Sequence, residues 1–203
     1  MPLVKGVARG TDVTGDPAPQ RATLDSSDAE SRWTAARALS GHAEAVPGLA
    51  AALGRETVPR VREAIMTALM RIGDTPSVEA ILPYLRSQDA GLRAAAIESL
   101  QALPEAIAPF MAALFSDRDS DVRLLATELA RNMKASEATR LLCGLIDREQ
   151  HPNVCAAAVD VLTEVGTPEA IPTLEKCAAR FVQSPFLPFA ISVAIARISG
   201  AEG

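Results

Sequence analysis

Hydrophobic residues recur at helical spacing through the stretch from Pro152 to Ala178. Up to Val165 they follow the order i, i+3, i+4, i+7, i+8 and i+11, which places them on one face of an α-helix. Gly166 is suited to the left-handed conformation that commonly ends a helix, and Pro168 suits the first turn of a new one. The pattern therefore predicts two helices joined at Gly166, whose apolar faces need neighbouring helices to cover them.

The same pattern returns at a nearly constant interval along the chain. The second residue of each first helix recurs at intervals of 30, 31, 30, 32 and 32 residues. A fixed period in this range is typical of solenoids, in which each repeat is stabilised by its neighbours. No long stretch alternates with a period of two, so we expect no β-strands. The recurring positions are Arg32, Arg62, Arg93, Arg123, Cys155 and Leu187.

These repeats carry a family resemblance. The pattern D-x-x-V-R-x-x-A-x-x-A-L followed by G-x-P-E-A-I-P-x-L resembles HEAT repeats, and Asp119–Leu129 and Gly166–Leu174 match it most closely. The period of about 30 residues is similar to that of the short bacterial type first associated with phycobilin lyases. The resemblance extends from about Ala22 to Gly200. It implies an all-α fold, a right-handed α-solenoid of about five and a half two-helix HEAT-like repeats.

The first 20 residues differ from the rest of the chain. They contain three glycines and three prolines without helical periodicity. We therefore expect a flexible N-terminal arm over residues 1–20, with a short docking peptide as the alternative, followed by a HEAT-like repeat domain over residues 21–203.

The overall composition narrows the classes of partner. Hydrophobic residues make up 48% of the chain and aromatic residues 3%, so the expected core consists of Ala, Leu, Ile and Val. The net charge of −5 disfavours binding to nucleic acid, whose affinity depends largely on Lys and Arg. Three cysteines without a CxxC motif, and the lack of a signal peptide, favour a cytoplasmic location. No apolar run is long enough to span a membrane.

Four arginines form what we call the arginine ladder: Arg32, Arg62, Arg93 and Arg123. Three of them follow an aspartate by four residues, at Asp28, Asp89 and Asp119. An aspartate at that place can cap the helix, while the arginine reaches carboxylates or carbonyls of the next repeat. The ladder is therefore expected to be structural, although a row of arginines could also bind a polyanion.

Acidic residues begin each second helix, and second helices line the concave face in the usual HEAT layout. First-turn glutamates are explained in part by the helix dipole. When residues later in the second helices are included, there are six acidic residues and two basic ones. This predicts a mildly acidic surface that suits a basic or mixed segment of a partner protein. The acids, which we call the acidic row, are Glu44, Glu79, Glu105, Glu137, Glu169 and Glu175. The candidate partner-binding residues here are Glu79, Tyr84, Glu137, Arg140, Glu175 and Lys176.

Enzymatic motifs are absent from the sequence. There is no Ser/His/Asp spacing, P-loop or GxGxxG, and the repeated His-Glu pairs that bind iron in deoxyhypusine hydroxylase do not occur. We therefore expect no catalytic, cofactor-binding or metal-binding residues, and a non-enzymatic interaction module. The family resemblance keeps one alternative, a bilin lyase-type or chromophore-handling subunit, for which only Arg140 and Lys176 are offered to the bilin propionates.

The C-terminal end has an unusual concentration of aromatic residues. Phe181, Phe186 and Phe189 lie within nine residues, and the sixth repeat has an apolar first helix without a second. One interpretation is that these residues turn inward and the last helix forms a lid. The other is an exposed patch, with Phe186 and Phe189 as contacts, that docks a partner or forms a homodimer through the C-terminal repeat.

Overall fold

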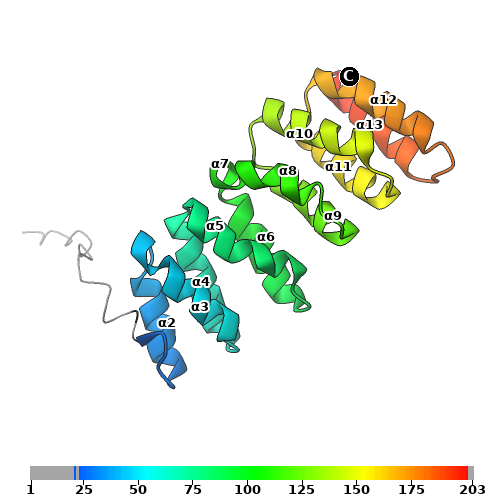
Figure 1. The fold of residues 1–203 in the computed structure, drawn as a ribbon. Helices are drawn as coiled ribbons and strands as arrows, with labels where there is room; N and C mark the ends of the chain where they lie inside the picture. The colour runs from blue at the N-terminus through cyan, green and yellow to red at the C-terminus, as the bar shows by residue number, and fades with distance from the viewer. Residues whose placement is uncertain (1–20, 22, 201–203) are drawn as a thin grey trace, which may run out of the picture.

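The chain forms a stack of two-helix repeats, seen here in a computed structural model that describes residues 21 and 23–200 (Figure 1). Within that part every regular element is a helix, as the sequence predicts. Each repeat begins with a first helix. The first helices are α2 (Ala29–Ala38), α4 (Pro59–Ile72), α6 (Ala90–Gln101), α9 (Ser120–Leu129), α11 (Pro152–Val165) and α13 (Leu187–Ile198).

Four of the five second helices are divided by a change of helical type. Each of these four carries a proline three or four residues after its first glutamate, and proline disturbs the hydrogen-bond pattern of an α-helix. α10 (Ala135–Arg148) has no proline there and runs without a break. The others are η1 (Ala43–Ala45) with α3 (Val46–Arg55), α5 (Thr75–Ile81) with η2 (Leu82–Arg86), α7 (Pro104–Ile107) with η3 (Ala108–Phe110) and α8 (Met111–Leu114), and η4 (Pro168–Ala170) with α12 (Ile171–Arg180).

Two layers of helices make up the solenoid. Each first helix packs on the first helix of the next repeat, from α2 to α13, and second helices pack on one another between most repeats. Figure 1 shows this succession as an elongated array with α2 and α13 at opposite ends. The core is one continuous cluster of mostly Ala, Leu, Ile and Val, with Phe115 as its one fully buried aromatic among the described residues. A core of small side chains allows the close stacking of layers that the sequence predicts.

The turns within repeats do not all depend on the same property of glycine. Gly73 adopts the left-handed conformation, with φ of 66° and ψ of 14°, and ends α4. The same expectation for Gly166 is wrong, because its backbone is extended, with φ of −67° and ψ of 152°. Glycine is needed at position 166 because a β-carbon there would lie 2.3 Å from the carbonyl oxygen of Leu162 and 3.0 Å from Ile198 Cδ1.

Aspartates cap the first helices as the spacing predicts. Asp28 accepts a hydrogen bond from the backbone amide of Ser31 at 2.8 Å, and Asp119 accepts one from Asp121 at 2.9 Å. Asp89 accepts from the amides of Gly91 and Leu92. These bonds satisfy amide groups that the first turn of a helix leaves without an intrahelical partner.

Two further expectations concern the N-terminal arm and membrane-spanning helices. The N-terminal arm, residues 1–20, lies outside the described residues, so the division into arm and repeat domain stays a prediction. Among the described helices, none combines the length and the apolar content that crossing a bilayer requires.

Candidate functional site

The arginine ladder joins first helices to the loops between repeats. Each of the four guanidinium groups donates a hydrogen bond to the backbone carbonyl six residues earlier, in the loop that precedes its helix. These distances range from 2.6 Å, from Arg93 to Ser87, to 2.9 Å, from Arg32 to Ser26. Because a loop carbonyl has no partner within a helix, the ladder fixes the path of the chain from one repeat to the next.

Two ladder arginines also form nearly buried ion pairs. Arg32 Nε lies 2.7 Å from Glu56 Oε2, and Arg123 Nε lies 2.6 Å from Glu149 Oε2. Each glutamate ends a second helix and accepts hydrogen bonds from the next two backbone amides. Arg62 instead pairs with the exposed Asp89, at 3.0 Å. The sequence analysis did not single out either glutamate, although both stand three residues before the proline that begins the next helix.

The ionisation of these glutamates reflects their partners. The hydrogen bond from Arg32, together with the amides of Val58 and Thr57, lowers the pKa of Glu56 to about 2 against the opposing effect of burial. Burial alone would raise the pKa of Glu149, but hydrogen bonds from Arg123 and two backbone amides lower it. Both carboxylates are therefore charged at neutral pH and stabilise the junctions that they close.

The predicted partner-binding residues of the second helices differ in exposure. Glu79, Arg140, Glu175 and Lys176 are exposed, whereas Glu137 is half-buried. Arg140 and Lys176 lie on α10 and α12, which pack side by side. Tyr84 packs against the core, and burial raises the pKa of its hydroxyl. The four exposed side chains are thus accessible to solvent, whereas Glu137 is less so and Tyr84 contributes mainly to packing.

The C-terminal aromatic residues do not share one environment. Phe181 packs against the core, whereas Phe186 and Phe189 are 78% and 72% exposed. Val182 and Val193 are also exposed, although the sequence analysis did not place them with the phenylalanines. We call these four exposed residues, Val182, Phe186, Phe189 and Val193, the C-terminal patch. α13 buries Leu187, Ile191 and Ala194, whereas Phe189 and Val193 of the same helix are exposed. The helix is therefore packed on one side and exposed on the other.

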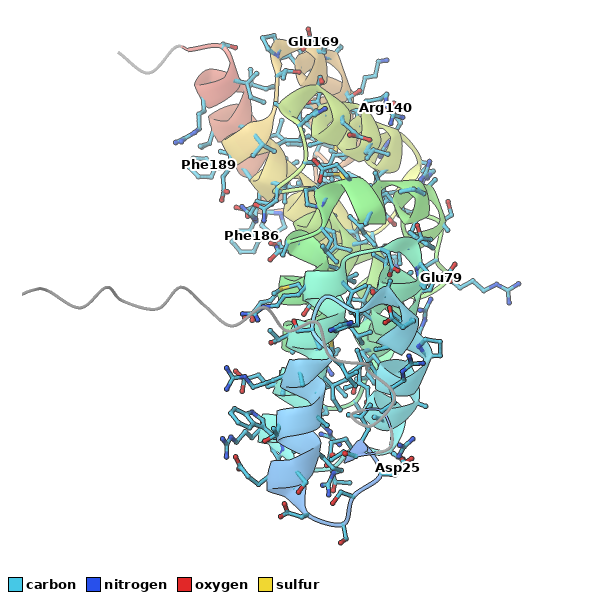
Figure 2. All side chains as sticks on the ribbon, turned by 90° about the vertical axis from the view of Figure 1, so that its left-hand side faces the viewer. Asp25, Glu79, Arg140, Glu169, Phe186 and Phe189 are labelled. Atoms are coloured by element: carbon cyan, nitrogen blue, oxygen red, sulfur yellow. The ribbon has the colours of Figure 1, made fainter. Side chains whose placement is uncertain are left out.

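The candidate residues therefore form two separate surfaces. Figure 2 shows Phe186 and Phe189 on one side of the array and Glu79 and Arg140 on the opposite side. A single short ligand cannot contact both. Among the described residues, no group of three or more His, Cys, Asp or Glu side chains is arranged to hold a metal ion.

Comparison with known proteins supports the repeat assignment. The sequence profile of HEAT repeats matches residues 19–101 and 107–181, which together are most of the chain. No curated protein matches the chain.

Several solved structures share the arrangement of repeats at low sequence identity. Human deoxyhypusine hydroxylase in complex with glycerol has a TM-score of 0.48 and 16% identity, over 91% of this chain and 84% of that one. The complex of CpcE and CpcF of phycocyanin lyase from Nostoc sp. has a TM-score of 0.42 and 18% identity, over 97% of this chain and 100% of that one. A designed armadillo repeat protein in complex with the peptide (KR)4 has a TM-score of 0.43 and 17% identity, over 91% and 100%. At these scores they carry no argument about function.

Proposed function

The chain belongs to the HEAT-repeat family, and we propose that it is a non-enzymatic adaptor that binds a partner protein through the C-terminal patch. A repeat solenoid suits a role in protein interaction because it presents extended surfaces on a rigid stack of helices. The observation that carries the proposal is the exposure of large apolar side chains at positions whose counterparts in α11 are buried or half-buried.

Alignment of the sixth repeat with the fifth identifies those positions. Phe186, the N-cap of α13, and Phe189 and Val193 within it correspond to Val154, Ala157 and Val161 of α11, 32 residues earlier. Val154 is 1% exposed and Val161 is 0% exposed, against 78% for Phe186 and 40% for Val193. These positions belong to a repeat-to-repeat interface in the interior of the array, as Ala64 and Ala68 of α4 do beside Trp33 of α2. The patch therefore has the composition of a repeat-to-repeat interface but is exposed.

The spacing of the apolar residues in the patch favours a helical partner. Phe186, Phe189 and Val193 follow the spacing i, i+3 and i+7, which forms a stripe that another helix can cover. Arg197 is the one charged residue of α13. A second copy of the chain would bring a second Arg197 and no acid from this helix, whereas a different protein can supply a carboxylate. We therefore assign the patch to a helical segment of a different protein rather than to a homodimer.

The acidic row supports a second contact with the same partner. Its member Glu79 lies with Arg140 on the opposite side of the array from Phe186 and Phe189 (Figure 2). A partner that also carries a basic segment would be attracted to this side, mainly through a faster rate of association.

Affinity capture with three matched chains tests the proposal. The wild type, the double variant Phe186→Ser/Phe189→Ser and the triple variant Glu79→Arg/Glu137→Arg/Glu175→Arg are used as baits, and captured proteins are identified by mass spectrometry. We expect one partner that the first variant loses and the second binds more slowly. If all three baits capture the same proteins equally, the patch is not the binding surface.

Light scattering separates a foreign partner from self-association. The purified wild type is expected to be monomeric at high micromolar concentration. A dimer that Phe189→Asp dissociates would instead assign the patch to a second copy of the chain.

A further inference from the structure

Two cysteines of repeat five lie against the same arginine. Cys155 is on α11 and Cys177 is on α12, and both are 0% exposed. Cys155 stands at the position that arginine occupies in the first four repeats. A guanidinium group is nevertheless present at this junction, because Arg180 reaches it from the last turn of α12.

The position of Arg180 is fixed by groups of two repeats. It donates hydrogen bonds to the backbone carbonyls of Ile146 and Asp147, in the last turn of α10. Its Nη2 lies 3.9 Å from Cys155 Sγ and 4.0 Å from Cys177 Sγ. One nitrogen atom therefore holds both sulfur atoms within hydrogen-bonding range and brings a positive charge to them.

This arrangement makes the two thiols chemically different. The hydrogen bond between them lowers the pKa of Cys177, and the charge of Arg180 acts in the same direction, while burial and the carboxylate of Asp147 oppose it. The same hydrogen bond, together with burial, raises the pKa of Cys155. Cys177 is thus the thiol that ionises first, and Cys155 keeps its proton.

We propose that Cys155 and Cys177 form an oxidisable dithiol, which hydrogen peroxide converts into a disulfide between α11 and α12, with Arg180 as the positioning residue. The Cys177 thiolate attacks one peroxide oxygen, an S–O bond forms, the O–O bond breaks, and hydroxide leaves. The Cys155 sulfur then attacks the sulfenic acid of Cys177, an S–S bond forms, and the hydroxyl group leaves as water with the Cys155 proton. Two thiols lose two electrons in total, and the peroxide is reduced to water.

Burial of both sulfur atoms selects the oxidant. A small molecule such as hydrogen peroxide can enter through local opening of the array, whereas a bulky disulfide such as oxidised glutathione is excluded. Cys143 is the internal control, since it is half-buried on α10 and burial raises the pKa of its thiol.

The sequence makes the product easy to identify. Cleavage after Arg140, Arg148, Lys176 and Arg180 places the three cysteines in the separate tryptic peptides 141–148, 149–176 and 177–180. The full chain is reduced, treated with hydrogen peroxide or oxidised glutathione, alkylated under denaturing conditions and digested. Peroxide is expected to link peptides 149–176 and 177–180 within one chain, and oxidised glutathione at the same concentration is expected to react at least tenfold more slowly.

Matched variants test each role. Cys143→Ser should leave the linked product unchanged, whereas Arg180→Gln should slow its formation severalfold and Arg180→Lys should restore part of the rate. The ultraviolet absorbance of the thiolate, followed against pH in Cys143→Ser chains, should show a higher midpoint after Arg180→Gln, which a merely structural role would not produce. Circular dichroism confirms that each variant is folded.

Two results would overturn the proposal. One is the recovery of peptides 149–176 and 177–180 as separate alkylated species after peroxide has oxidised Cys143. The other is a linked product that forms at the same rate in the wild type and in a folded Arg180→Gln chain, which would remove Arg180 from the reaction.

Discussion

The two ends of the array carry opposite kinds of side chain at equivalent positions. In the first repeat the positions in question hold Ser31, Thr34 and Ala38. In the sixth repeat the equivalent positions hold Phe186, Phe189 and Val193. An end layer in contact with water is expected to be polar, and the N-terminal end meets this expectation. The C-terminal end does not, and its exposed apolar side chains are the basis of the proposed contact with another helix.

The forces that hold the two ends also differ. Repeat one is closed by the ion pair from Arg32 to Glu56 and tied to its neighbour by the ion pair from Arg60 to Glu30, and the Trp33 ring contacts two guanidinium groups. Between residues 181 and 200 the described structure contains no ion pair, and α13 is held by apolar contacts with α11 and α12. One end is thus sensitive to charge and the other to apolar burial.

The largest expected effect comes from placing a charge, in two separate variants, at equivalent positions of α11 and α13. Val161→Asp puts a carboxylate at a site that is 0% exposed, and we expect it to destabilise the fold by about 4 kcal/mol or more. Val193→Asp, at the equivalent position of α13, should change stability by less than about 0.5 kcal/mol. Denaturant unfolding of the two variants measures both values. Similar losses in both would mean that α13 is covered on its outer side.

Removal of the Glu56 carboxylate should have the next largest effect. Glu56→Gln leaves the charge of Arg32 without its buried partner, and we expect a loss of about 3 kcal/mol. In the wild type the pKa of Glu56 falls from 4.5 to about 2 on folding. Its contribution is therefore complete above about pH 4.5 and is lost as the pH falls towards 2. Acid unfolding curves should show this component in the wild type and lack it in the variant.

Trp33 tests the N-terminal end alone. Its ring centroid lies 4.0 Å from the guanidinium carbon of Arg60 and 4.6 Å from that of Arg37. Trp33→Ala should cost about 1–2 kcal/mol through the loss of cation–π contacts and of packing. Trp33→Phe, which keeps a ring in the same place, should recover part of this loss in thermal melts. Equal melting temperatures for the wild type and Trp33→Ala would show that the ring contributes nothing to this end.

The smallest expected effect is that of salt on the exposed ion pairs. Arg60 pairs with Glu30 and Arg55 with Asp25, one repeat apart, but all four side chains are more than half exposed. Each pair should contribute less than about 1 kcal/mol and should weaken in concentrated sodium chloride. Hydrogen exchange of α2 should therefore quicken slightly in salt, while that of α13 should not. Faster exchange of α13 in salt would contradict the apolar account of the C-terminal end.

Most of the fold follows from the sequence because the signals are local and repeated. The repeated first helices occur at the predicted interval, and the aspartate caps lie where the spacing places them. The breaks in the second helices could also have been predicted, since the prolines that cause them are visible in the sequence.

The surfaces could be predicted only in part. Phe181 and Phe186 are five residues apart and equally apolar, yet one packs inward and the other is exposed, because the direction of each side chain depends on how α12 meets α13. The contact of Arg180 with carbonyls more than 30 residues earlier likewise depends on the stacking of repeats. The repeat pattern of the sequence does not predict such a contact.

The extended backbone at Gly166 has a consequence for how the chain can vary. Its φ and ψ are accessible to any residue, so the glycine is explained by lack of space, first of all at the carbonyl oxygen of Leu162 in its own helix. The obstacle is partly Ile198, a side chain of the following repeat, which a β-carbon at position 166 would meet at 3.0 Å. A change at residue 198 alone would therefore not make room for a larger residue at position 166, because the backbone of Leu162 would still be in the way. An engineer who joins repeat six to another array therefore has to supply a glycine at the preceding turn, where the end of one helix and a side chain of the next repeat leave no space for a β-carbon.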